Sequence, residues 1–424
     1  MTESHQVAQQ RTVRRAVAAA AAGNVVEWYD WTAYAIFALF FSAQFFPKED
    51  PVAALLSTFG VFALGFLARP LGSVTLGRIT DRLGRTTALA VSVTIVAIAS
   101  ALIGLAPTAD MIGIWAAVWL LVLRIAQGIA LGAETSAAIT FLAESATPKR
   151  RGFLVSFYVS TSAAGTLIAS FIGLILTSVL SGDQMQGFGW RIPFLFGGAL
   201  GIVALFVRRR AVETLSANHK PDAHPLRTLW REHRGLAVDT FILGGAVALP
   251  FFVLVTGFPA IVDLLGADSQ VTFQANVVGL IILAALLLGF GALSDRIGRR
   301  PVLLTGSILF FVITIPGVAL LWDPTEPWRV FAAQILAVIP IAAMTGTVQT
   351  TLLERYPVAL RGSAFGFVWA LSMAVFGGTG PMIATYLADR GITFVMSAYF
   401  MLLFAAAVII VIRMKETAFR PLPA

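Results

Sequence analysis

The sequence lacks cysteine and contains few charged residues. With Cys 0 among 424 residues, disulfides, thiolate metal sites and cysteine nucleophiles are excluded. Only 12% of the residues are charged and 58% are hydrophobic, whereas a soluble protein carries roughly 25% charged residues. Such a chain could not cover its surface in water, which excludes an ordinary soluble enzyme, a disordered chain and a fibrous one. The composition therefore predicts a polytopic membrane protein.

Motifs typical of enzymes are also missing. The sequence has no Gly-x-x-x-x-Gly-Lys phosphate loop and no histidine pair at metal-ligand spacing. ATP-driven transport within this chain is therefore excluded, and we expect no enzyme activity, no metal and no cofactor other than a coupling proton. A channel or a receptor stays open as a class, but neither would predict the duplicated loops described below.

The long hydrophobic runs are the main structural signal. A helix that crosses a bilayer needs about 20 apolar residues, and lipid leaves no backbone group unpaired. The runs are continuous rather than alternating, which disfavours a β-barrel. The first run is too long for a signal peptide, so we expect no processing. We predict an all-α polytopic membrane protein with twelve transmembrane helices. They lie near residues 17–45, 53–76, 87–106, 112–144, 153–179, 190–208, 237–262, 271–292, 301–321, 328–351, 362–387 and 393–413.

The basic residues predict the orientation. On this map they gather mainly in the loops on the side that also holds both termini. The clusters are Arg11/Arg14/Arg15, Arg78/Arg82/Arg85, Lys149/Arg150/Arg151, Arg208/Arg209/Arg210, Arg296/Arg299/Arg300 and Arg413/Lys415. The positive-inside rule makes that side cytoplasmic. We therefore expect a multi-pass protein of the cell inner (plasma) membrane, and the net charge of +8 points to membrane lipids and not to nucleic acid as partners.

The chain divides into two similar halves. The longest polar stretch, from Arg208 to Arg234, suits a cytoplasmic linker. We predict an amino-terminal six-helix bundle at 1–208, a linker at 209–236 and a carboxy-terminal six-helix bundle at 237–424. Because the same loop motifs recur in both parts, two six-helix halves in parallel orientation are the simplest interpretation.

Two repeated motifs predict a gate on the cytoplasmic side. A Gly-x-x-x-Asp-Arg-x-Gly-Arg loop follows the second and the eighth spans, and a Glu followed seven residues later by Arg-Gly ends the fourth and the tenth. The gate candidates are Gly77, Asp81, Arg82, Gly84, Arg85, Glu144, Arg151, Gly291, Asp295, Arg296, Gly298, Arg299, Glu354 and Arg361. Such charge clusters can hold helix ends together in one state and release them in another. The alternative is that these loops only enforce topology.

These loops resemble the signature of the major facilitator superfamily. Further segments resemble its metabolite:proton symporter family, and within that family most closely the α-ketoglutarate permease-like carriers. They are Gly23 to Asp30, Arg69 to Gly72, Arg124 to Gly128, Glu144 to Gly152, Gly189 to Phe194 and Phe376 to Thr379. The resemblance implies alternating access and proton-coupled uptake of carboxylates or zwitterions. The segment Gly132 to Ala137 departs from the family pattern around its glutamate.

Charged residues inside the spans are candidates for the transport site, because charge in a bilayer is costly unless it is paired or hydrated. Arg124 is near the midplane of its span, and its guanidinium can bind a carboxylate with two hydrogen bonds. We predict Arg124 as the main substrate anchor, with Arg69, Tyr29 and Arg191 as further substrate-binding residues. For Arg124 the alternative is a structural arginine neutralised by Glu27 or Asp30. Arg69 precedes Pro70 near the cytoplasmic end of its span, so structural pairing is an equal alternative to substrate contact. For Arg191 the alternative is an interfacial arginine.

Proton coupling needs a group that titrates as access alternates, and a buried carboxylate beside an arginine can do this. The candidates are Glu27, Asp30 and Glu134. Several aromatic side chains could line the cavity: Trp28, Tyr29, Trp31, Tyr34, Tyr158 and Trp369.

The sequence thus predicts a secondary active transporter, a functional monomer that takes up a small organic acid, such as a dicarboxylate, together with protons. Uptake of a proline- or betaine-like zwitterion is the alternative, and export of an apolar drug is a weaker one. The short segment after Arg413 disfavours an osmosensing relative with a long helical extension.

Overall fold

The computed structural model describes residues 3–46, 49–83, 85–132, 134–209, 225–321 and 323–423. Within these ranges, side chains are not described for residues 3–19, 73–83, 85–89, 134–137, 207–209, 315 and 318. The described part of the chain is almost entirely helical, as the continuous apolar runs predict.

Twelve helical passes make up the described bundle. The first six are α1 (Glu3–Phe45), α2 (Pro51–Leu83), α3 (Arg85–Gly104), α5 (Trp115–Leu131) continued by α6 (Glu134–Ser145), α7 (Arg151–Val179) and α9 (Arg191–Arg209). The last six are α11 (Arg234–Phe251) with η2 (Phe252–Thr256) and α12 (Phe258–Leu264), α13 (Ser269–Ile297), α14 (Arg299–Leu320), α15 (Pro327–Leu353), α16 (Ser363–Ser372) with η4 (Met373–Gly378) and α17 (Gly380–Asp389), and α18 (Phe394–Arg413). Short connecting elements are α4 (Ala109–Ile112), α8 (Gly182–Gln184), η1 (Met185–Gly189), α10 (Pro225–Glu232) and η3 (Val358–Leu360).

Many of these helices are long and apolar enough to cross a bilayer. Seven described helices meet that criterion by length and composition, and an eighth span is possible if the bent pair Gly182–Gly189 and Arg191–Phe206 counts as one. Two shorter apolar helices, Ala90–Gly104 and Trp115–Leu131, lie in the third and fourth predicted spans. The predicted all-α membrane fold is confirmed.

Three predicted spans are interrupted rather than regular. The fourth breaks between α5 and α6, where Gly132 follows the last residue of α5. The seventh and the eleventh each contain a π-helical segment, η2 and η4. Pro250 lies just before η2, and a proline inside a helix removes one i→i−4 hydrogen bond. Such breaks are typical of functional positions in helices.

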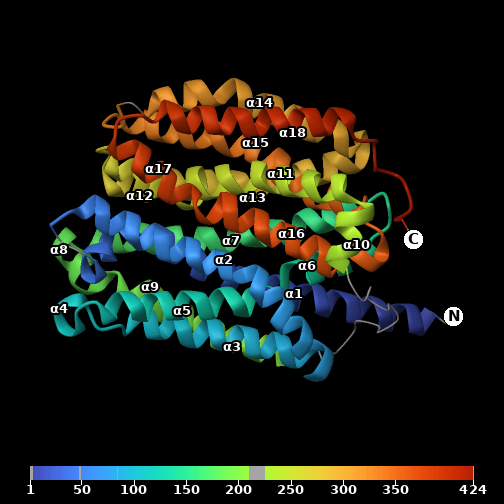
Figure 1. Cartoon of the computed structure of the whole chain (residues 1–424), viewed down its shortest axis with the longest axis horizontal. Coiled ribbons are helices and arrows are strands. Elements are labelled where there is room, and N and C mark those ends of the chain that lie inside the picture. Colours follow the sequence, from blue (N-terminus) through green and yellow to red (C-terminus); the bar gives the residue numbers. More distant parts are fainter. Residues whose placement is uncertain are drawn as a thin grey trace.

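The helices lie roughly antiparallel in two groups (Figure 1). α1, α2, α3, α5, α7 and α9 form one group, and the helices from α11 to α18 form the other. The most extensive contact between the groups joins α7 to α13, and α2 packs against α16, η4 and α17. The predicted division at residues 209–236 stays a prediction, because residues 210–224 lie outside the described part; α10 occupies its end.

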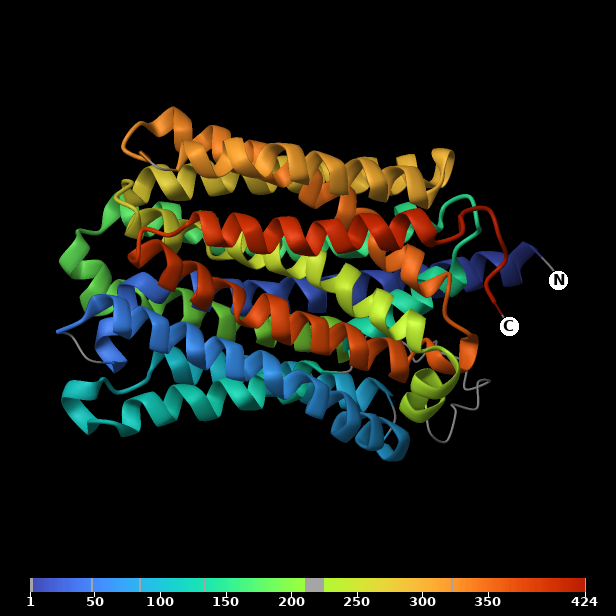
Figure 2. The ribbon, with the colours of Figure 1, turned by 45° about the horizontal axis from the view of Figure 1, so that its top comes forward.

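Both chain ends lie at the same end of the bundle, which we call the terminal end (Figures 1 and 2). α6 and α10 lie there as well, whereas α4, α8 and α12 lie at the opposite end. These two ends are the reference points for the site.

Candidate functional site

A cavity of about 60 Å³ lies between the two groups of helices. α1, α2, α5 and α7 line it from the first group, and α11, η2, α15, α16 and η4 from the second. Its wall is mostly apolar. Among the described lining residues Arg69 is the one charged side chain. The other polar or aromatic lining residues are Asn24, Trp28, Tyr158, Ser162, Phe251, Phe252, Thr345, Gln349 and Trp369.

Arg69 and Glu27 form a buried ion pair at this cavity. The Nη2 atom of Arg69 lies 2.8 Å from Oε1 of Glu27, and both residues are largely buried, at 8% and 3% exposure. The guanidinium also lies 4.6 Å from the ring centre of Trp31 and 4.7 Å from that of Phe66. These rings attract the cation and fix its position beside the cavity.

Arg124 forms a second ion pair, which is sealed from the cavity. Its Nη1 atom lies 3.0 Å from Oδ2 of Asp30, and Gln127 donates to the same oxygen at 2.9 Å. Arg124 and Gln127 are fully buried, and the guanidinium lies 4.0 Å from the ring centre of Tyr34. Arg124 does not line the cavity in this conformation, so its role as a substrate anchor stays a prediction. The alternative, a structural arginine neutralised by a carboxylate, describes what the structure has.

Two other predicted substrate residues also lie away from the cavity. The hydroxyl of Tyr29 donates to the backbone oxygen of Pro193 at 2.6 Å, and its side chain is fully buried. Arg191 donates to the backbone oxygens of Gly104 and Ala106. Both side chains tie α9 to neighbouring elements and do not line the cavity in this conformation, so their contact with substrate stays a prediction. The side chain of Glu134, the third proton-coupling candidate, lies outside the described residues.

The predicted aromatic lining is correct in part. Trp28, Tyr158 and Trp369 line the cavity, whereas Trp31 and Tyr34 do not and instead pack against the two arginines. Trp28 packs against Phe251 and Phe252, with ring centres 5.3 and 5.7 Å apart. The lining residues Asn24, Thr345 and Gln349 were missed by the sequence analysis, which looked for charge. The signal that could have found the last two is a polar pair four residues apart in an apolar span.

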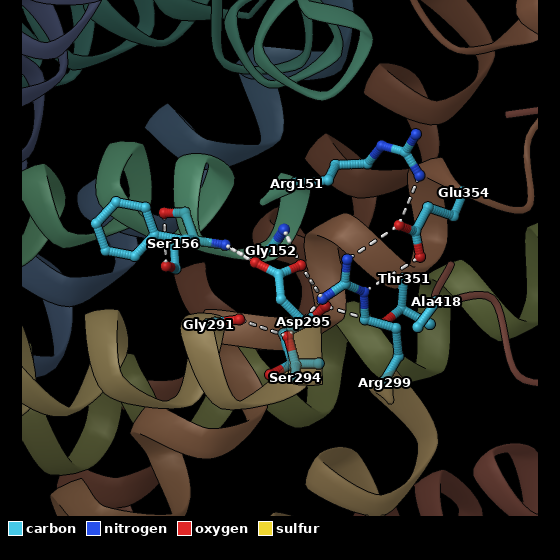
Figure 3. A network of polar contacts seen from close by, with 12 residues as sticks. Arg151, Gly152, Ser156, Gly291, Ser294, Asp295, Arg299, Thr351, Glu354 and Ala418 are labelled. Carbon is cyan, nitrogen blue, oxygen red and sulfur yellow. Dashed lines mark hydrogen bonds and ion pairs between the residues drawn. The ribbon is translucent and has the colours of Figure 1, made fainter. Parts of the chain in front are cut away.

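A polar network joins the two groups at the terminal end (Figure 3). Glu354, at the end of α15, binds Arg151 of α7 at 2.9 Å and Arg299 of α14 at 3.1 Å. Asp295 accepts hydrogen bonds from the backbone nitrogens of Gly152 and Phe153, each at 2.8 Å, in the first turn of α7. A carboxylate at a helix amino terminus is stabilised by the free N–H groups there. The predicted charge cluster therefore bridges the two groups.

Close backbone approach supports this network. A Cβ atom added to Gly291 would lie 2.0 Å from Oγ of Ser156, so only glycine allows α13 to meet α7 there. Gly298 has a φ of +105° and ends α13. Arg296 is exposed, whereas Arg299, which was also predicted for the gate, makes these contacts; the role of Arg296 in the gate stays a prediction. In the first copy of the motif, the side chains of Gly77, Asp81, Arg82, Gly84 and Arg85 lie outside the described residues.

A second cross-link and the carboxy-terminal segment complete the terminal end. Arg361 lies 3.2 Å from Glu144 of the first group. After α18 the chain returns to the network, where Thr417 donates to Glu354 at 2.6 Å and Glu416 accepts from the backbone nitrogens of Arg299 and Arg300. This segment covers the residues that bridge the groups.

The groups also touch toward the opposite end. Ser170 of α7 hydrogen-bonds Asn276 of α13 at 2.6 Å, and both side chains are fully buried. One turn further out, the ring of Phe273 packs so closely on Gly173 that an added Cβ atom would lie 2.2 Å from the ring. The cavity is therefore bounded by interhelical contacts toward both ends of the bundle.

The sequence profile described as Major Facilitator Superfamily matches residues 20–381. The chain belongs to the major facilitator superfamily. The α-ketoglutarate permease of Escherichia coli K12 is 32% identical over 381 residues, covering 89% of this chain and 88% of the relative. The proline/betaine transporter of the same strain is 31% identical over 439 residues, covering 97% of this chain and 85% of the relative. The names of two relatives with similar sequence identity thus state different substrates.

The solved structures agree with this assignment at the level of the fold. The xylose transporter of Escherichia coli in a partially occluded inward-open conformation has a TM-score of 0.73 at 17% identity, with 97% of this chain and 100% of that chain covered. The chain is therefore a multi-pass membrane transporter of this superfamily, and the predicted family is confirmed. The substrate is left open between organic acid and zwitterion.

Proposed function

We propose that this chain is a proton-coupled symporter that takes up a small carboxylate-bearing solute by alternating access. The observation that supports this most is the Arg69–Glu27 ion pair at the cavity wall. A substrate carboxylate and the Glu27 carboxylate compete for the same guanidinium. Binding of the solute to Arg69 therefore favours protonation of Glu27, because a buried carboxylate that loses its cation is costly unless it is neutral.

The transport cycle follows from this competition. A proton from outside neutralises Glu27 and frees Arg69 for the solute. The loaded carrier then closes toward the outside and opens toward the inside. The Glu27–Arg69 ion pair forms again once the proton and the solute have left on that side. We place the terminal end on the cytoplasmic side of the plasma membrane, because the basic loops lie there.

The role of the Asp30–Arg124 pair in this proposal is structural. Both charges are almost completely buried and satisfy each other through a direct contact, with Gln127 as a third partner. The pair holds α1 against α5 and so keeps α1 in place while Glu27, one helical turn earlier, exchanges its partner.

Two solute classes compete, and the cavity favours one. A dicarboxylate, as the sequence suggested, brings a second negative charge to a wall where Arg69 is the one described charged residue. A zwitterion instead places its cationic nitrogen near Trp28, Phe251, Phe252 and Trp369, whose ring faces attract cations. We therefore propose a carboxylate at Arg69 in both cases, with a zwitterion as the better fit.

Uptake into proteoliposomes tests the proposal. The purified protein is reconstituted, a pH gradient is imposed, and labelled α-ketoglutarate, proline and glycine betaine are offered in turn. Acid-stimulated accumulation that a protonophore abolishes is expected for at least one of them. Uptake that ignores the gradient would indicate a facilitator instead, and failure to accumulate any of the three would overturn the proposed function.

A further inference from the structure

Two polar side chains of α15 line the cavity, and each has a buried oxygen atom without a partner among the described residues. Thr345 and Gln349 lie one helical turn apart and therefore on the same face of the helix. They are 6% and 8% exposed, and both belong to the cavity wall. Oγ1 of Thr345 and Oε1 of Gln349 are buried and make no hydrogen bond within the described residues.

The hydroxyl of Thr345 makes no hydrogen bond within the described residues, and the same holds for Thr347 and Thr350 of this helix. A threonine in a helix commonly donates to the carbonyl oxygen four residues earlier. Thr351 of the same helix does so to Thr347 at 2.9 Å, and Thr240 of α11 does so to Leu236 at 2.8 Å. Thr345 leaves this local bond unmade. Buried polar groups without partners cost free energy. Thr345 differs from Thr347 and Thr350 because it lines the cavity, where a bound ligand can supply the missing partner.

We propose that Thr345 and Gln349 form the second half of the solute site and bind the end of the solute that lies away from its carboxylate. This inference rests on the proposed function, which places the carboxylate at Arg69. Arg69 belongs to the first group of helices, and Thr345 and Gln349 belong to the second. A solute held at both places bridges the two groups.

The side-chain chemistry defines the class of solute. An amide and a hydroxyl are uncharged, and both accept hydrogen bonds from N–H or O–H groups. They cannot neutralise a second carboxylate as a guanidinium would. The site therefore takes a small solute with one carboxylate and, at its other end, an ammonium N–H or a hydroxyl, without a second negative charge.

Bridging also gives the solute a way to drive the conformational change. A ligand shifts a conformational equilibrium only if its affinity differs between the two states. A solute bound to one group alone makes the same contacts in every state, whereas one that touches both groups loses contacts when they separate. Thr345 and Gln349 thus link solute binding to closure of the cavity.

The experiment compares two cavity variants with two matched controls. Thr345→Val and Gln349→Met remove the polar atoms at nearly constant volume. Thr347→Val and Thr350→Val make the same change on the same helix, at fully buried threonines whose Oγ1 atoms also make no described hydrogen bond but which do not line the cavity. The KM for uptake of labelled proline, driven by an imposed pH gradient, is measured for each variant in proteoliposomes.

We expect each cavity variant to raise the KM for proline roughly tenfold and each control to change it less than about twofold. N,N-dimethylproline, which lacks the N–H group, should show a shift of less than about twofold in the Gln349→Met variant. An unchanged KM for proline in both cavity variants, or equal shifts in the controls, overturns the inference while leaving the proposed function intact. Gradient-driven uptake of α-ketoglutarate without uptake of proline overturns the stated class of solute, and loss of all gradient-driven uptake in the unmodified protein overturns the proposed function itself.

Discussion

Glu27 and Asp30 lie three residues apart on α1, yet each binds a different arginine. Glu27 binds Arg69 at the cavity wall, and Asp30 binds Arg124 in the sealed interior. The indole of Trp31 contacts both guanidinium groups, at 4.6 Å for Arg69 and 5.3 Å for Arg124. One helix thus carries one ion pair at the cavity wall and one in the sealed interior, and we propose that only the first exchanges its partner.

Glu27→Gln should uncouple transport from the pH gradient. The amide keeps the size of the side chain but can neither titrate nor compete as a charge for Arg69. We expect gradient-driven accumulation to fall at least about tenfold while exchange of labelled for unlabelled solute persists, because exchange needs no net proton movement. Proteoliposome uptake and counterflow measure the two. If the variant still accumulates solute against its gradient, Glu27 is not the coupling group.

Asp30→Asn should lower the stability of the folded protein, and not only the stimulation of uptake by acid. Removing one partner of a buried pair leaves an uncompensated charge on Arg124, which costs about 3–5 kcal/mol. We expect a lower unfolding temperature in detergent, and partial recovery in the double variant Asp30→Asn with Arg124→Gln. A variant of unchanged stability that has lost acid-stimulated uptake would instead identify Asp30 as the proton carrier.

Glu354→Gln should open the terminal end. The change removes the charge that binds Arg151 and Arg299. The protein has no cysteine, so Ser162→Cys introduces a single label site on the cavity wall. We expect a membrane-impermeant maleimide added on the terminal side to react several times faster in the Glu354→Gln background. Glu232→Gln, at an exposed residue of the same end, is the control, and equal rates in the two backgrounds would contradict a gating role.

Two glycine variants should open opposite ends. Gly291→Ala adds a Cβ atom against Ser156 near the terminal end, and Gly173→Ala adds one against the ring of Phe273 toward the other end. With the Ser162→Cys label site in place, we expect faster labelling from the terminal side in the first variant and from the other side in the second. Phe273→Ala should reverse the effect of Gly173→Ala. Labelling that rises from the same side in both variants would show that these contacts do not close separate ends.

The carboxy-terminal segment should make stability depend on pH in the acid range. Burial acts to raise the pKa of Glu416, but hydrogen bonds from the backbone nitrogens of Ala418, Arg299, Arg300 and Thr417 outweigh it and leave the pKa below its ordinary value of 4.5. A lowered carboxylate pKa contributes stability that is fully present above about pH 4.5 and is lost as the pH falls through the lowered value. The unfolding temperatures of the unmodified protein and of Glu416→Gln should therefore differ at pH 7 and converge once the pH falls below that lowered pKa. Parallel curves over this range would contradict the assignment.

Much of the architecture could be predicted from the chain alone. Apolar runs of bilayer length, separated by basic loops, determine a helical membrane fold because lipid leaves no other way to pair the backbone. The repeated motifs also led directly to Asp295, Arg299 and Glu354 at one end of the bundle. Each motif is a short run of residues at a helix end, so its position can be predicted from the sequence without knowledge of the packing.

Local patterns could not decide which buried charge meets the cavity. Arg69 and Arg124 both lie inside apolar spans, and the residue near the middle of its span was the better sequence-based candidate. The packing of α5 against α1 and α2 sealed Arg124 with Asp30 and left Arg69 at the wall. The spacing of Thr345 and Gln349 in the sequence places them on one face of a helix, but only the packing of α15 against its neighbours shows that this face lines the cavity.

The sequence by itself thus determined that the protein lies in a lipid bilayer, where its helices are, that its loop motifs recur and to which family of transporters it belongs. These features depend on composition and on spacing along one chain. The tertiary structure decided which side chains share the cavity and which neutralise one another, because partners such as Arg69 and Glu27 come from different helices and are set by how those helices pack.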